Sequence, residues 1–223
     1  IYRIYKSNFF EFNSGKILKG LLIAGIILRI IMSVHDMYNR PVQTSDYEKH
    51  EKLGQRIAFE NRYYDFTGVE LYNYRQPGLP FIFAMGFLLY NDPVTSAVIM
   101  MLFSFGVLIS GFYFFKDLKN IAGIFSFGYL CLSPNMLFMA SNSNTQLPFF
   151  FFLILLFIAL KFYKGKTYQL IIIGVLMACE IYIRFNFLML IILIPFILQK
   201  HSDRNLMYSI GKLGIIFASC LII

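Results

Sequence analysis

The amino-acid sequence predicts an all-α membrane protein, a polytopic helical bundle with one large polar loop after its first span. Hydrophobic residues make up 58% of the 223 residues and charged residues only 14%, whereas soluble domains average about 45–50% and about 25%. The mean hydropathy of +0.63 also indicates a chain rich in apolar residues. Apolar runs long enough to cross a bilayer, which takes about 20 residues, recur along the chain between short polar segments. These observations exclude an ordinary soluble domain.

Seven apolar runs are predicted as membrane spans. The stretch 168–199 is too long for one helix and short for two, so it is divided at Arg184. The segment Leu79–Tyr90 is introduced by prolines and is too short to cross, so we expect a helix lying at the membrane interface. The predicted spans are residues 17–35, 94–115, 121–139, 146–163, 168–183, 187–199 and 206–223.

The charge pattern predicts the orientation of these spans. The net charge is +8, but the Lys and Arg residues form short clusters between apolar runs, which is typical of cytoplasmic loops and argues against nucleic-acid binding. If 79–90 does not cross, the clusters at 3–19, 116–119, 161–166 and 200–212 fall on one side. We therefore expect a multi-pass protein of the cell membrane with a cytoplasmic N-terminus, an external 40–78 loop, and an external 133–146 turn.

One membrane domain is expected over residues 1–223. The first run lacks a small-residue cleavage site, so it is predicted to be a span rather than a cleaved signal peptide. The chain begins with Ile and stops inside an apolar run, so we interpret it as the N-terminal portion of a longer protein. No cysteine lies in a ligand-type spacing, which argues against a metal cluster or a disulfide framework; the cysteines are Cys131, Cys179 and Cys220.

Asp46 is the first candidate for chemistry. It opens the segment SDYEKHEKLGQRIA, residues 45–58, which has the pattern of an amphipathic helix just after the first span. An acid at this position can cap the helix. It can also act as a base at the water–lipid boundary and take a proton from an acceptor hydroxyl. Glu48 and His50, on the same predicted helix, are candidates for substrate binding.

Two arginines are candidates for binding an anion. Arg75 precedes a turn stiffened by Pro77 and Pro80, where its guanidinium either holds a phosphate or snorkels to the interface. Arg184 lies near the end of a span, four residues after Glu180, so on a helix the two side chains share a face. Ionisable groups there indicate function by default, and a self-neutralising structural pair is the alternative.

The order of these segments resembles GT-C membrane glycosyltransferases, in the branch of the dolichyl-phosphate-mannose–protein mannosyltransferases and aminoarabinose transferases. Members have an Arg in the first span, an acid opening the first external loop, an Arg-x-Pro-Gly-x-Pro-like element, a Ser-Pro after the third span and an Arg in a later short span. The matching residues here are Arg29, Asp46, Arg75 with Pro77, Gly78 and Pro80, Ser133–Pro134, and Arg184. The resemblance covers about residues 17–223.

The resemblance implies a sugar transferase that uses a polyprenyl- or dolichyl-phosphate donor. Asp46 is then the base, and Arg75 and Arg184 contact the donor phosphate. The acceptor is a glycan, a lipid or a protein, and membrane lipids surround the bundle. Tyr47 stands where many members have a second acid, and residues 144–146 are Asn, Thr and Gln where many have another. No cofactor is therefore assigned, and a divalent metal ion is disfavoured.

Two other functions stay open at this stage. A transporter or flippase of lipid-linked saccharides would place its charges near mid-bilayer on broken spans, and Arg29 is the residue that fits it. A non-catalytic membrane assembly subunit would keep the spans without needing Asp46.

Overall fold

The computed structural model of the protein describes residues 8–38, 45–61, 76–92, 94–117, 121–140 and 142–184. Within these ranges the chain is all-helical, with eight helices and no strand, so the predicted all-α fold class is confirmed. The helices are α1 (Asn8–Tyr38), α2 (Ser45–Glu60), α3 (Gly78–Leu89), α4 (Val94–Phe115), α5 (Ile121–Leu132), α6 (Pro134–Phe138), α7 (Gln146–Lys161) and α8 (Thr167–Ile183).

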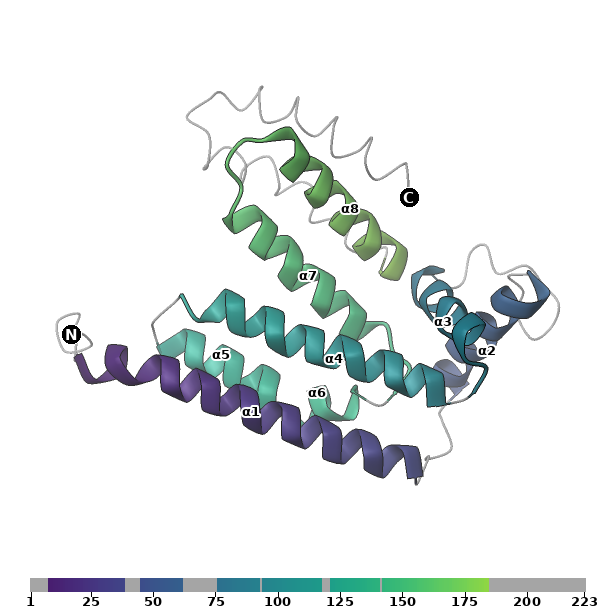
Figure 1. The fold of residues 1–223 in the computed structure, drawn as a ribbon, viewed down its shortest axis with the longest axis horizontal. Coiled ribbons are helices and arrows are strands. Elements are labelled where there is room, and N and C mark those ends of the chain that lie inside the picture. Colours follow the sequence, from purple (N-terminus) through teal and green to yellow (C-terminus); the bar gives the residue numbers. More distant parts are fainter. Residues whose placement is uncertain are drawn as a thin grey trace.

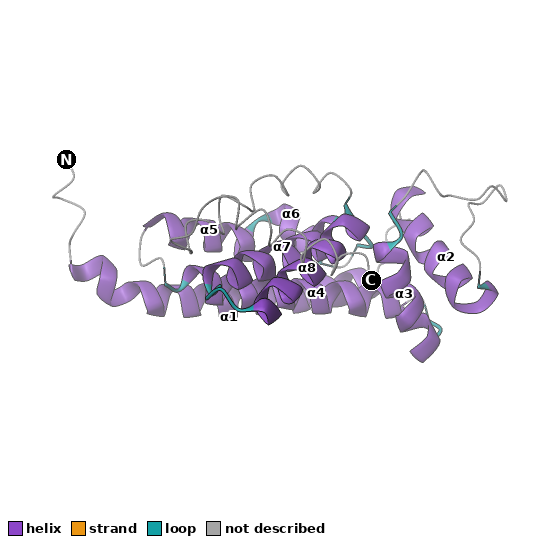
Figure 2. Cartoon of the chain, turned by 90° about the horizontal axis from the view of Figure 1, so that it is seen from above, coloured by secondary structure: helices purple, strands orange, loops and turns teal. Residues whose placement is uncertain are grey.

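The long helices form an elongated layer, with α2 and α3 beside one end of it (Figures 1 and 2). Helix α5 packs against both α1 and α4, α7 packs on α4, and α8 packs on α7. The start of α1, the end of α4, the start of α5 and the α7–α8 connection lie toward one end, which we call the basic end (Figure 1). There, Lys161 of α7 pairs with Asp117 after α4 at 2.8 Å.

Two of these helices are long and apolar enough to cross a membrane. They are the segments Ser14–Asp36 of α1 and Val94–Phe115 of α4. Helices α7 and α8 have 16 and 17 residues, which corresponds to about 24–26 Å at 1.5 Å per residue and falls short of a hydrocarbon core of about 30 Å. The predicted spans 187–199 and 206–223 lie outside the described residues.

The predicted span 121–139 is wrong as a single helix. The chain breaks at Ser133, so that α5 ends at Leu132 and the short α6 begins at Pro134. Proline has no N–H to continue the helical ladder, and its ring clashes with the carbonyl four residues earlier, here that of Leu130. The break therefore follows from Pro134, which interrupts an otherwise apolar run.

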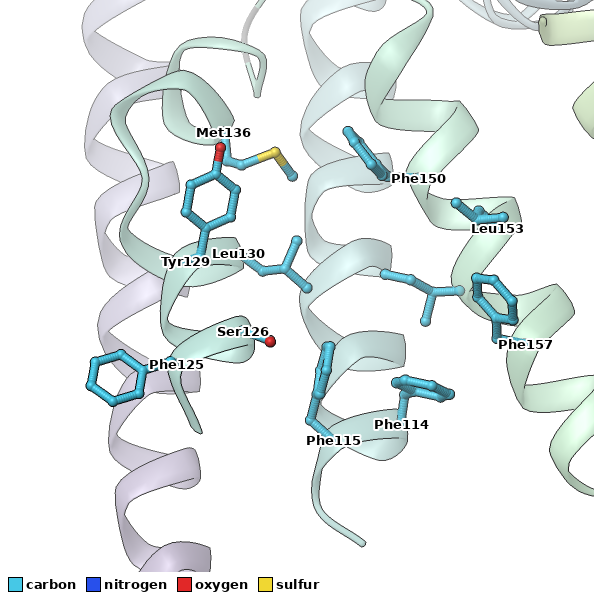
Figure 3. A pocket seen from close by; sticks show the side chains of 11 residues that line it. Phe114, Phe115, Phe125, Ser126, Tyr129, Leu130, Met136, Phe150, Leu153 and Phe157 are labelled. Carbon is cyan, nitrogen blue, oxygen red and sulfur yellow. The ribbon is translucent and has the colours of Figure 1, made fainter. Parts of the chain in front are cut away.

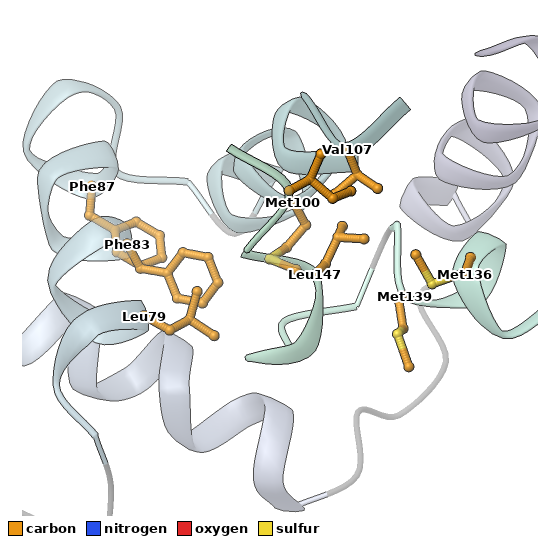
Figure 4. Packing of buried hydrophobic residues seen from close by; sticks show 9 residues of the cluster. Leu79, Phe83, Phe87, Met100, Val107, Met136, Met139 and Leu147 are labelled. Carbon is orange, nitrogen blue, oxygen red and sulfur yellow. The ribbon is translucent and has the colours of Figure 1, made fainter. Parts of the chain in front are cut away.

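The α2–α3 end is held to the layer by an apolar core. Leu79, Phe83 and Phe87 of α3 are fully or almost fully buried and belong to one cluster with residues of α4, α6 and α7 (Figure 4). The other members of that cluster are Met100, Val107, Met136, Met139, Leu147 and Ile154. Because α3 contributes its side chains to this core, its position relative to α4 and α7 is fixed by packing rather than by the loops.

Helices α2 and α3 approach each other closely at Gly54. A Cβ atom at this position would lie 2.7 Å from the Cβ of Phe83 and 3.1 Å from the carbonyl oxygen of Pro80. Only glycine therefore permits this crossing. The contact fixes the amphipathic α2, which carries the predicted base, against the apolar α3.

Candidate functional site

The described segments that the sequence analysis predicts to be functional lie at the α2–α3 end of the layer. Helices α2 and α3, the loop after α6 and the last turn of α8 lie toward this end (Figure 1). The α3 helix contacts α2, α4 and α8. The candidate site is therefore built from four parts of the chain that are far apart in sequence.

Asp46 is the second residue of α2, as the sequence predicts for a residue near the start of an amphipathic helix. The side chains of Asp46 and Glu48 lie outside the described residues, so neither the capping role nor the base role is tested. The side chain of His50, one helical turn after Asp46, is buried, with 8% of its surface exposed. His50 therefore faces the protein rather than the solvent.

Glu51 is a polar anchor that the sequence reasoning missed. Its Oε1 atom accepts hydrogen bonds from the hydroxyls of Ser96 on α4 and Ser143 in the loop before α7, each at 2.5 Å. Both serines are fully buried. One carboxylate thus joins α2, α4 and the 142–145 loop. Hydrogen bonds to an ionised acceptor are about twice as strong as neutral ones.

The 142–145 loop is itself ordered by buried polar groups. The amide nitrogen of Asn144 donates to the carbonyls of Met139 and Asn142, at 3.0 and 2.6 Å. Its Oδ1 atom accepts hydrogen bonds from the backbone N–H groups of Gln146 and Leu147, the first two residues of α7. The Asn144 side chain thus satisfies the first two backbone N–H groups of α7.

An apolar cavity of about 310 Å³ lies between α3, α7 and α8. It is lined by Gly78, Phe81, Ile82, Phe152, Cys179, Tyr182 and Ile183. Gly78 packs so tightly on α8 that a Cβ there would be 2.8 Å from the carbonyl oxygen of Tyr182. The cavity thus borders both predicted anion-binding segments, since Arg184 follows Ile183 and Arg75 precedes Gly78 by three residues. Arg75 itself lies outside the described residues.

The structure contradicts the alternative of a self-neutralising structural pair between Glu180 and Arg184. Helix α8 ends at Ile183, and Arg184 has an extended backbone (φ −146°, ψ 105°), so the two residues do not share a helical face. The guanidinium of Arg184 instead lies over the ring of Phe149, 5.6 Å from its centroid. This contact is a cation–π interaction.

Glu180 is fully buried, and no described residue donates a hydrogen bond to either carboxyl oxygen. Burying a polar group without a partner costs free energy. Within the described residues Glu180 therefore carries a burial cost with no compensating hydrogen bond, and it directly follows the cavity-lining Cys179.

Arg29, in the C-terminal half of α1, is fully buried and has a structural role. Its Nη2 atom donates to the carbonyl of Leu130 at 2.6 Å, and Nη1 donates to the carbonyls of Cys131 at 2.9 Å and Gly25 at 3.2 Å. The carbonyl of Leu130 is the one that a residue at position 134 would normally bind, but Pro134 has no N–H. Arg29 therefore supplies the donor that the helix break removes.

In the part of the chain that the structure describes, no three His, Cys, Asp or Glu side chains come together as a metal site. Comparisons with protein-family models, with curated proteins and with solved structures gave no match to this chain.

Proposed function

We propose that the protein is a membrane glycosyltransferase that moves a sugar from a polyprenyl- or dolichyl-phosphate donor to an acceptor hydroxyl at the external membrane face. The observation that carries the proposal is the 310 Å³ cavity between α3, α7 and α8. Its walls are apolar, Arg184 directly follows the lining residue Ile183, and the lining residue Gly78 comes three residues after Arg75 in the sequence. An amphiphilic anion has the matching chemistry, with a hydrocarbon chain for the cavity and a phosphate for the guanidinium groups.

The base in this proposal is Asp46, on a helix that packs directly against α3. Gly54 and Phe83 fix that packing, and Glu51 ties the same helix to α4 and to the 142–145 loop. A base that works on an acceptor hydroxyl has to be held within hydrogen-bond reach of it. A helix anchored at three places supports such positioning.

The transporter alternative draws less support from the structure. It rested on Arg29 as a charged residue inside a span, and substrate-binding charges in transporters point into a central pathway. The guanidinium of Arg29 is fully buried and hydrogen-bonded to α1, α4 and α5. Holding these three helices together is enough to explain why a charged residue lies inside the span.

The test is a transfer assay on the full-length protein with a panel of polyprenyl-phosphate sugars. We expect transfer from at least one donor, and a loss of about 10²–10⁴-fold in Asp46→Asn. Asn caps a helix about as well as Asp, so this variant should stay folded and bind donor. Asp36→Asn, at the end of α1, is the matched control and should stay active. Full activity of Asp46→Asn would refute the base, and no transfer from any donor would refute the function.

A further inference from the structure

Two apolar clefts run along opposite sides of the contact between α4 and α7. The first, which we call the phenylalanine cleft, has a volume of about 620 Å³ and lies between α5, α6 and α7 with α4 as its floor (Figure 3). Its lining contains no charged side chain and is formed by Phe114, Phe115, Phe125, Ser126, Tyr129, Leu130, Met136, Phe150, Leu153, Ile154 and Phe157.

The second, which we call the Lys116 cleft, has a volume of about 360 Å³. Its floor is at Gly106, against which the ring of Phe151 packs, and its lining is completed by Ile109, Ser110, Tyr113, Lys116, Leu155, Ile158 and Phe162. The hydroxyl of Ser110 donates to the carbonyl of Gly106 at 2.6 Å, so its hydrogen-bonding demand is met within α4. The walls therefore present mainly hydrocarbon.

One end of the Lys116 cleft is positively charged. The Lys116 side chain is exposed, and its amine lies 4.4 Å from the centroid of the Tyr113 ring, which also lines the cleft. Asp117, the neighbouring acid, pairs with Lys161. The α4–α5 and α7–α8 connections together contain five lysines and this one aspartate (KDLKN, 116–120, and KFYKGK, 161–166). An anion that lies at this end meets a net positive field.

We propose that the Lys116 cleft holds an acyl chain of an anionic glycerophospholipid, whose headgroup phosphate binds Lys116. An apolar trough on a membrane protein is filled by hydrocarbon, and a cation at its end selects the lipids that carry negative charge. The cleft is lined along α4 from Gly106 to Lys116 and along α7 from Phe151 to Phe162, whereas the donor cavity lies between α3, α7 and α8. This site does not depend on the proposed transferase activity.

The experiment measures lipid binding to the purified full-length protein. Phosphatidylglycerol and phosphatidylcholine with identical acyl chains are titrated in detergent, and bound lipid is counted by native mass spectrometry. We expect a preference of about five-fold for phosphatidylglycerol, in line with the contribution of one lysine near anionic lipid. Lys116→Gln should remove the preference, and Lys116→Arg should retain it.

Two control variants, Lys164→Gln and Ser126→Phe, distinguish this site from general surface charge and from the other apolar cleft. Lys164→Gln removes an equal charge from an exposed position of the same end that does not line the cleft, and it should leave the preference intact. Ile109→Trp fills the Lys116 cleft and should weaken binding of both lipids, whereas Ser126→Phe, in the phenylalanine cleft, should not change the preference.

An unchanged preference in Lys116→Gln would overturn the headgroup assignment, as would an equal loss in Lys164→Gln. Unchanged binding in Ile109→Trp would overturn the placement of the acyl chain. Thermal unfolding is measured for every variant. Lys116 is exposed and its amine lies over the Tyr113 ring, so Lys116→Gln should fold normally and decides the question even if Ile109→Trp does not fold.

Discussion

The carboxylate of Glu51 accepts a hydrogen bond of 2.5 Å from the hydroxyl of Ser143, a residue 92 positions later in the sequence. The same oxygen accepts a hydrogen bond from the hydroxyl of Ser96 on α4. Helix α2 is therefore held by polar contacts with α4 and the 142–145 loop as well as by the apolar contact with α3. A carboxylate can accept several hydrogen bonds at once. This arrangement makes the position of α2 depend on Glu51.

Removing the Glu51 carboxylate should loosen α2. Glu51→Ala leaves two buried serine hydroxyls without their acceptor, and we expect a loss of about 1.5–3 kcal/mol in the free energy of unfolding. Thermal unfolding in detergent and hydrogen exchange of the α2 amides measure it. Glu60→Ala, exposed at the end of the same helix, is the control and should change little. Equal behaviour of the two variants would contradict the anchor role.

Replacing Arg29 should destabilise the α1–α5 contact. Arg29→Met leaves the carbonyls of Leu130 and Cys131 without a donor, at about 1–3 kcal/mol for each unsatisfied buried group. Ser104→Ala removes only the contact with Nε and should cost about 0.6 kcal/mol, the average for interhelical hydrogen bonds in membranes. Unfolding midpoints in detergent test this ranking, and a larger effect of Ser104→Ala would contradict it.

Replacing Glu180 by methionine should stabilise the fold. Methionine has a similar length and adapts to irregular apolar sites, and it removes a buried carboxyl group that has no donor among the described residues. We expect a gain of about 1–3 kcal/mol in the free energy of unfolding. Glu180→Gln keeps polar atoms at the site and should gain little. A loss of stability in Glu180→Met would show that the carboxyl group is satisfied.

The orientation predicted from the lysine clusters is tested by thiol labelling. Glu60 and Lys164 are both exposed and lie at the α2–α3 end and the basic end. An impermeant maleimide added to intact cells should label Glu60→Cys and not Lys164→Cys, and permeabilised cells should label both. The unsubstituted protein reports labelling of the native cysteines. Labelling of Lys164→Cys alone would reverse the orientation.

Several elements could be predicted from the sequence because local pattern decides them. The bounds of α4 match the predicted 94–115 run, and the predicted starts of α5 and α7 match the helices, since flanking polar residues mark these ends. Helix α3 also follows the prediction for 79–90 within one residue. These predictions rest on the positions of prolines and on the length and hydropathy of each apolar run, all of which are local properties of the sequence.

The contacts of the buried polar groups could not be predicted in the same way. Arg29 was found as a charge inside a span, but its partners lie about a hundred residues later. The alternative of a Glu180–Arg184 pair required a helix that continues through residue 184, but α8 ends at Ile183, where the predicted span 168–183 also ends. Ser133–Pro134 belongs to the family resemblance, and Pro134 is also the local signal that ends α5. Glu51 gave no sequence signal beyond its charge.

The hydrogen bonds from Arg29 to the end of α5 have a consequence for how the protein is made. The acceptors Leu130 and Cys131 lie 101 and 102 residues after Arg29. At a synthesis rate of about 5–20 residues per second, α1 leaves the ribosome roughly 5–20 s before its partner. An arginine at the centre of a membrane helix costs about 2.5–3.5 kcal/mol on insertion scales, which is an upper bound for Arg29 in the C-terminal half of α1. We therefore expect α1 to remain at the translocon until α5 arrives, and the two helices to enter the lipid together.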